Sequence, residues 1–351
     1  MSGSAAVRLL ALILAAAALA VACSGPLPGA TARTTPSPTG GPTSRASATP
    51  APTVEATPPP TPPLPAYYIE SLRARSYPGG KLEIGAEVTC RGFSRCLPGV
   101  HTYRMSWPSG GQTMTGLISM PEGSGPFPVV VVNHGFIPPE RYGEGQDSLL
   151  FAEPMAQHGF IAVSPNWPGY LGSGPAPPEL PSIVGQVVTA LDLVTSVGSI
   201  PQADPSRVAF VGHSNGGGIS EIAMVVDRRV KAVVLHAPVS SDMADNARKW
   251  WVARPDSLGS LGTPDANPEG YRHLSPREYF QPGQAPVLIV QGTVDHTIPR
   301  PWTEATYAAL QARGVPTQVA WLDGGDHDLV GANQAQAISL QVDWIRKTLA
   351  V

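Results

Sequence analysis

The sequence predicts an α/β fold: a mainly parallel central sheet with helices on both faces and a short antiparallel part at its amino-terminal side. Runs of β-branched residues without polar alternation, as in 127–135, indicate parallel strands buried on both faces. Segments with apolar residues at helical spacing, as in 182–197 and 337–349, alternate with such runs. Two short β-rich segments around a Pro-Ser-Gly-Gly turn, 101–107 and 114–120, indicate the antiparallel part.

The other elements follow the same patterns. A first β-rich segment covers 81–88, and a helix is expected over 215–226. The further strands are expected at 159–165, 207–214, 231–238, 286–292 and 317–323. In open α/β sheets, ligands bind beyond the carboxyl ends of the strands, so functional residues are expected in the segments that follow each strand.

The composition separates a tail from a folded part. The chain has 351 residues, 14% of them charged, and a formal net charge of −3, which does not favour nucleic acid or an acidic membrane surface as a partner. Residues 23–66 are rich in Pro, Thr and Ser, with almost no large apolar side chains. Such a segment cannot bury enough surface to offset its ordering entropy. We therefore expect a disordered tether over 23–66 and one catalytic domain over 67–351.

The first 22 residues resemble an export signal. One arginine precedes an unbroken apolar run from Leu9 to Ala22, which is short for a membrane span. The small residues before Cys23 resemble a bacterial lipobox, in which the cysteine is lipidated after cleavage, although Ala20 stands where that motif usually has leucine. We expect a signal peptide over 1–22 and a lipidated Cys23, with the protein outside the cytoplasm. Plain secretion and an uncleaved anchor are the alternatives.

Two further cysteines, Cys90 and Cys96, are separated by five residues. An oxidising compartment favours a disulfide between them, and two free thiols are the alternative.

A serine between glycines is the candidate nucleophile. Ser214 lies in the pentapeptide Gly-His-Ser-Asn-Gly, 212–216, between an expected strand and an expected helix. A sharp strand-to-helix turn exposes such a serine, and the flanking glycines let the turn close. A glycine-rich turn with an incidental serine is the alternative.

A serine hydroxyl needs a base, and the base needs a carboxylate to orient it. In this strand-turn-helix class the chain order is Ser, acid, His. His327 and Asp295 follow later expected strands in that order and at the same sheet edge. The other candidates are His296 as the base and Asp326 or Asp328 as the acid, while His213 and His236 are expected to be structural.

Acyl transfer also requires donors for the oxyanion. The backbone N–H of Asn215, directly after the serine, is one candidate. The N–H of Phe136, in the loop after the strand 127–133, is the second, with Ile137 next.

These motifs resemble the α/β-hydrolase superfamily over nearly all of 67–351. The resemblance is to the catalytic domain of the prolyl oligopeptidase family, to dienelactone-hydrolase-like relatives and to cutinase-like esterases, and it rests on the segments DPSRVAFVGHSNGGG, PVLIVQGTVDHTIP, GGDHDL and NHGF. It implies the α/β-hydrolase fold and a triad of Ser214, Asp295 and His327. Prolyl oligopeptidases carry a large β-propeller, for which 67–120 is too short, so the resemblance leaves peptide specificity open.

Four aromatic residues are candidates for a substrate pocket: Trp167, Tyr170, Trp250 and Trp251. The last two lie in a long insertion, 238–284, that could form a lid. Apolar walls suit acyl or aromatic ester groups, and packing between loops is the alternative.

No metal or cofactor is expected, because Asp326-His327-Asp328 lacks spaced partner ligands and the chain has no phosphate-binding loop or dinucleotide fingerprint. The interpretation is an exported serine hydrolase that cleaves carboxylic esters through an acyl-enzyme, with a small ester or short peptide as substrate. The alternatives are a serine peptidase of the prolyl oligopeptidase type and a non-catalytic binding protein with the same fold. The sequence makes no prediction of the oligomeric state.

Overall fold

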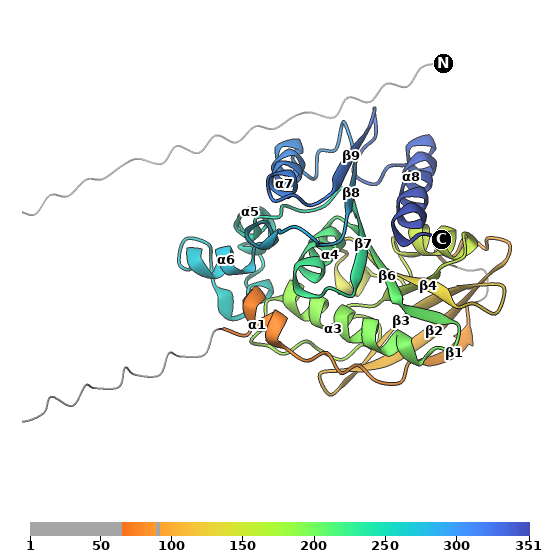
Figure 1. Cartoon of the computed structure of the whole chain (residues 1–351). Helices are drawn as coiled ribbons and strands as arrows, with labels where there is room; N and C mark the ends of the chain where they lie inside the picture. Colours follow the sequence, from red (N-terminus) through yellow and green to blue (C-terminus); the bar gives the residue numbers. More distant parts are fainter. Residues whose placement is uncertain (1–64, 89–91) are drawn as a thin grey trace, which may run out of the picture. The chain divides into compact units, whose positions relative to one another are not determined.

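The computed structural model describes residues 65–88 and 92–351 (Figure 1). The chain divides into two units after Pro60, and every described residue belongs to the second unit, 61–351. The expected signal peptide, Cys23 and nearly all of the expected tether lie outside the described residues, as does Cys90 of the expected disulfide.

A mixed sheet forms the centre of this unit. In the described part its order is β1-β2-β3-β5-β4-β6-β7-β8-β9. The first four strands in this order pair antiparallel, and all pairs from β5 to β9 are parallel. The strands are β1 (Glu83–Glu87), β2 (Val100–Ser109), β3 (Gln112–Pro121), β4 (Phe127–Asn133), β5 (Ile161–Pro165), β6 (Ala203–His213), β7 (Val230–His236), β8 (Val287–Gly292) and β9 (Thr317–Leu322). The predicted fold class is therefore confirmed.

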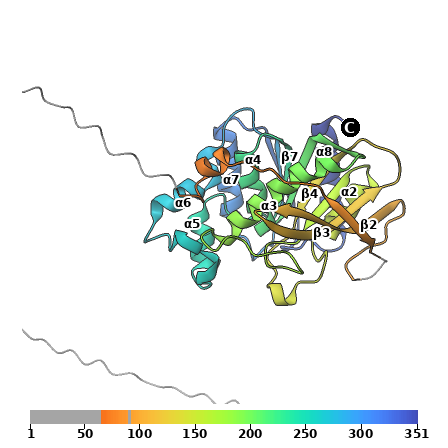
Figure 2. The same cartoon turned by 90° about the horizontal axis from the view of Figure 1, so that it is seen from below.

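Helices cover both faces of the sheet (Figures 1 and 2). The α-helices are α1 (Ile69–Ala74), α2 (Leu149–Gln157), α3 (Ser182–Ser196), α4 (Asn215–Val226), α5 (Met243–Asn246), α6 (Pro268–Leu274), α7 (Arg300–Ala312) and α8 (Ala332–Leu349). The insertion 238–284 contains α5, a π-helical turn (Ala247–Trp251) and α6, so it is a series of short helices.

Two hydrophobic cores explain why the central strands lack polar alternation. On β4, Val129 and Val131 pack into one core with apolar residues of α3 and α4. Their neighbours Val130 and Val132 pack into the other core with residues of α2 and α8. Because side chains alternate between the faces of a strand, both sets must be apolar where both faces are covered.

One described stretch, Ser182–Ser199, has the length and mean hydropathy, 1.3, of a membrane span. Within the protein 78% of it is buried, and most of it is α3. It is therefore the central helix of a folded core.

Candidate active site

A strained turn places Ser214 at the junction of β6 and α4. Its φ is 52° and its ψ is −116°, in the left-handed half of backbone space that favours glycine. The flanking glycines are required by close approach of the backbone. A Cβ on Gly212 would lie 2.1 Å from the carbonyl oxygen of Gly216, and a Cβ on Gly216 would lie 2.1 Å from that of Asn133. The local sequence can therefore form this turn only with glycine at both positions.

His327 and Asp295 meet at the same sheet edge. The β6, β8 and β9 strands are parallel members of one sheet, so the loops after them emerge together. His327 Nδ1 lies 2.9 Å from Asp295 Oδ2. The Asp295 side chain is only 1% exposed, whereas that of His327 is 16% exposed. This contact holds one ring nitrogen of His327 and leaves the other for a reacting group.

Four donors stabilise the carboxylate of Asp295. The backbone N–H groups of Thr297 and Ile298 each donate to Oδ1 at 2.8 Å. The other oxygen, Oδ2, accepts from His327 Nδ1 at 2.9 Å and from Gln291 Nε2 at 3.3 Å. Burial alone would raise the pKa of Asp295, but these hydrogen bonds and the nearby imidazole lower it below its usual value. Asp295 is therefore an anion suited to orienting an imidazole.

The other acid–base candidates do not take part in this contact. Asp326, Asp328 and His296 are exposed, and Asp295 is the carboxylate that contacts His327. His236, at the end of β7, is fully buried, and burial holds its pKa well below its usual value. Its neutral ring packs edge-on against Phe151.

The two expected oxyanion donors come from two different segments, the start of α4 and the loop after β4. Asn215 begins α4, where backbone N–H groups have no partner within the helix. Its side chain is fixed by a 3.1 Å hydrogen bond to Gln186 Oε1. Phe136 lies in the loop after β4, and its N–H donates to no acceptor in the part of the chain that the structure describes.

A cavity of about 630 Å³ opens at Ser214 and His327. Tyr170, Trp250 and Trp251 line it, as the sequence analysis expected of pocket residues. The Arg254 guanidinium, which also lines it, lies 4.2 Å from the centre of the Phe136 ring. These aromatic groups make its walls mainly apolar.

Trp167 is a correction to the expected pocket. It does not line the cavity, because its ring is 1% exposed and stacks on His134 with 3.9 Å between ring centres. Burial lowers the pKa of His134 to about 4, so Trp167 packs on a neutral ring in the loop that follows β4.

Asp147 is a site residue that the sequence analysis missed. It precedes α2, and its Oδ2 lies 2.8 Å from His213 Nδ1 and 2.6 Å from the backbone nitrogen of Gly135. No motif surrounds Asp147, and its partner stands 66 positions later, so spacing offered no signal.

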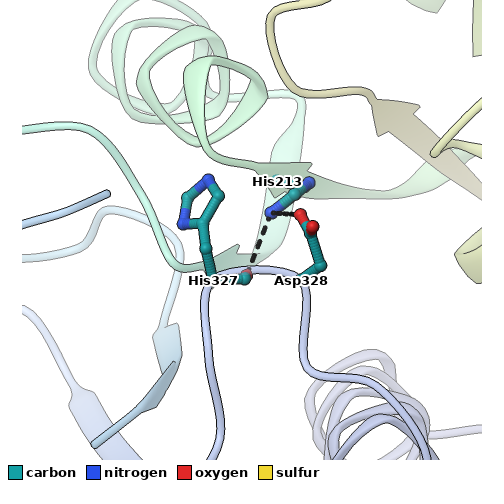
Figure 3. A group of neighbouring side chains, drawn as sticks. All are labelled: His213, His327 and Asp328. Carbon is teal, nitrogen blue, oxygen red and sulfur yellow. Dashed lines mark hydrogen bonds and ion pairs between the residues drawn. The ribbon is translucent and has the colours of Figure 1, made fainter. Parts of the chain in front are cut away.

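The other ring nitrogen of His213, Nε2, faces the loop that contains His327. Figure 3 shows His213 Nε2 turned toward the backbone of His327 and the carboxylate of Asp328. The distances are 3.3 Å to the His327 carbonyl oxygen and 3.9 Å to Asp328 Oδ1. His213, His327 and Asp328 can bring ligand atoms within 4.8 Å of one another, which the isolated Asp-His-Asp segment did not indicate.

Comparisons with known proteins give two matching family models and several proteins of similar fold. The sequence model of the prolyl oligopeptidase family matches residues 184–351, and that of chlorophyllase matches 102–258. Dipeptidyl-peptidase 5 of Porphyromonas gingivalis is 30% identical over 173 residues, which cover 47% of this chain and 25% of the relative. The chain has the α/β-hydrolase fold that these likenesses indicate. It spans about a quarter of the length of the curated relatives it matches.

Solved structures share the fold of this chain. Acylaminoacyl peptidase of Pyrococcus horikoshii superimposes with a TM-score of 0.58 at 21% identity, over 72% of this chain and 42% of its own. Acetyl xylan esterase 1 of a Thermoanaerobacterium species superimposes with a TM-score of 0.55 at 15% identity, over 79% of this chain and 90% of its own. The fold is therefore shared by peptidases and esterases.

Proposed function

We propose that this protein is a serine hydrolase that cleaves carboxylic esters through an acyl-enzyme on Ser214. His327 Nε2 takes the hydroxyl proton as Oγ attacks the carbonyl carbon, and then gives that proton to the leaving alkoxide. Asp295 holds Nδ1–H and offsets the imidazolium charge. A water molecule, deprotonated by His327, then attacks the acyl carbon, and His327 gives this proton to Ser214 Oγ as the carboxylic acid leaves. The N–H groups of Phe136 and Asn215 would stabilise the oxyanion in both steps.

One observation carries this proposal. His327 is held at 2.9 Å by a buried carboxylate and lines the same cavity as a serine on a strained turn. A turn that holds a non-glycine residue at φ 52° has a conformational cost, and such strain is concentrated at functional sites.

The preference for esters rests on the cavity and on the relatives. Its aromatic walls suit an acyl or aromatic group. A chlorophyllase model matches the part of the chain that forms much of these walls, and an esterase is among the proteins of similar fold. The peptidase alternative is supported by the prolyl oligopeptidase model and by the identity to dipeptidyl-peptidase 5.

A fluorophosphonate probe tests the nucleophile. We expect stoichiometric labelling of the natural chain and none of Ser214→Ala, because the probe reacts with an activated serine. Ser182→Ala is the matched control, since Ser182 lines the same cavity and is expected to leave labelling unchanged. Full labelling of Ser214→Ala would refute the assignment.

A substrate panel separates the two activities. We expect kcat/KM on nitrophenyl esters of short acids to exceed that on proline-containing and acylated peptide amides by at least about a hundredfold. Faster turnover of the amides would decide for the peptidase.

We propose further that the hydrolase is exported and tethered by a lipid at Cys23. The support is the apolar run that ends at Ala22 and the Pro-rich segment that follows. In a bacterial host, metabolic labelling with a fatty-acid analogue is expected for the natural chain and not for Cys23→Ser. Unlabelled natural chain in the culture medium would favour plain secretion.

A further inference from the structure

His213 is enclosed by groups from several elements of the site. Its side chain is 6% exposed, and its backbone joins β6 to the turn of Ser214. The titratable groups that face its ring are Asp147 before α2, His236 on β7, and His327 and Asp328 in the loop after β9.

Both ring nitrogens of His213 face oxygen atoms that accept hydrogen bonds. Nδ1 lies 2.8 Å from a carboxylate oxygen of Asp147, and Nε2 lies 3.3 Å from the backbone carbonyl oxygen of His327. Each nitrogen must therefore donate, and an imidazole that donates twice is a cation. No lone pair then remains on this ring for a metal ion.

Electrostatics at the pair agree with these hydrogen bonds. Burial would lower the pKa of His213, but the adjacent carboxylate raises it above its usual value. Burial would raise the pKa of Asp147, but the imidazolium and the Gly135 N–H lower it to about 2. Both shifts favour the carboxylate form of Asp147 and the imidazolium form of His213.

The pair touches each of the three segments that surround the reaction centre. Asp147 Oδ2 also accepts from Gly135, the residue before the proposed donor Phe136. His213 precedes the nucleophile in sequence and bonds to the backbone of the proposed base. A Cβ placed on Gly135 would lie 3.2 Å from both Asp147 Oδ2 and His213 Nδ1, so the packing is close.

We propose that Asp147 and His213 are positioning residues. Their ion pair holds the loop of Gly135 and Phe136 and the loop of His327 in place against the turn of Ser214. The inference rests on the triad proposed above. Acyl transfer is sensitive to such positioning, because a misplacement of about 1 Å can cost on the order of a hundredfold in rate.

Asp147→Asn tests the pair with little change of shape. A neutral amide no longer favours the charged ring, so His213 keeps one proton and loses its hydrogen bond to the His327 carbonyl. We expect the rate constant of fluorophosphonate labelling to fall roughly 10- to 100-fold. With a nitrophenyl ester, kcat should fall by a similar factor while KM changes less than about threefold, because the cavity walls are untouched.

Asp192→Asn is the matched control. Asp192 is a 3% exposed carboxylate on α3 that accepts hydrogen bonds from Ser109 and Gly79, away from the site. Its variant removes a buried charge at comparable structural cost and should label within about threefold of the natural chain, measured well below the unfolding temperature of both variants. Equal rates for the two Asn variants would overturn the proposal.

The protonation of His213 provides a readout that does not depend on the stability of Asp147→Asn. In ¹⁵N spectra of the natural chain at pH 7, one of the eight imidazoles should show two protonated nitrogens and disappear in His213→Gln. A singly protonated His213 would overturn the proposal, even if Asp147→Asn does not fold.

These readouts also separate this inference from the proposed function. Labelling reports an activated serine whether the natural substrate is an ester or a peptide. Persistent labelling of Ser214→Ala would refute the proposed triad, whereas normal labelling of Asp147→Asn would refute only the positioning role of Asp147 and His213.

Discussion

At the scale of single residues, the turn that carries the proposed nucleophile depends on its two neighbouring glycines. Gly212 and Gly216 flank Ser214 in sequence, so the steric requirement of the turn is visible in five consecutive letters. Asp147 meets His213 only because β4, β6 and the loop before α2 converge in space. A pairing of that kind depends on long-range packing, which leaves no local pattern in the chain.

Asp295→Asn is expected to lower kcat roughly 10³- to 10⁴-fold, because an amide favours the wrong tautomer of His327 while leaving the loop in place. Steady-state kinetics on a nitrophenyl ester measures the loss. Asp326→Asn is the control, since Asp326 is exposed one position before the histidine and should retain nearly full activity. The reverse order of the two activities would move the acid role to Asp326.

At the scale of elements, the sequence predicted the helices and strands with strong apolar patterns and did not predict the helices whose apolar pattern is weak. The strands and α3, α4 and α8 lie close to where the sequence placed them. The α7 helix was not predicted, because two of its three buried side chains are threonines. The α2 helix was not predicted either, since seven of its nine residues are buried and Pro154 lies inside it, so it has no polar face with a helical period.

The insertion 238–284 supplies one wall of the cavity, and a prediction follows at this scale. Trp250→Ala is expected to raise KM for an aromatic ester by roughly tenfold and to change kcat little, because a wall contact binds substrate and transition state alike. Kinetics on phenylacetate and acetate esters of one alcohol measures the effect, which should be larger for the aromatic acid.

Trp344→Ala is the control for loss of an indole, since Trp344 is on α8, against the opposite core. An unchanged KM for Trp250→Ala would show that its ring packs the insertion and does not contact substrate.

At the scale of the whole molecule, the predicted sheet was right in class, and its strand order had to come from the structure. That β6, β8 and β9 open at one edge follows from parallel pairing. The position of β5 between β3 and β4 does not follow from local sequence, because it depends on which crossover buries α2 and α3 on opposite faces.

The stability of the whole fold should depend on pH through Glu221. This α4 side chain is 0% exposed, and its carboxyl has no hydrogen-bond partner among the described residues. Burial raises its pKa well above the usual value. The folded state then binds the proton more tightly than the unfolded state does. The free energy of unfolding is therefore highest below the pKa of the unfolded state, near 4.3, and falls by about 1.4 kcal/mol per pH unit until the pH reaches the pKa of the folded state.

Glu221→Gln removes this dependence. Urea unfolding at pH 5 and pH 8 should show the variant gaining stability over the natural chain as pH rises, while Glu122→Gln, at an exposed position, gains none. A constant difference between variant and natural chain at both pH values would contradict the burial argument.

The outermost strand, β1, affects how copies of this protein behave when they are packed closely together. All five of its residues are exposed, two of them are glutamates, and its pairing with β2 is irregular between Ile84 and Glu87. Short, charged and irregular borders resist the addition of a strand from another copy. Molecules gathered densely on one surface would thus repel at this border and stay individually folded.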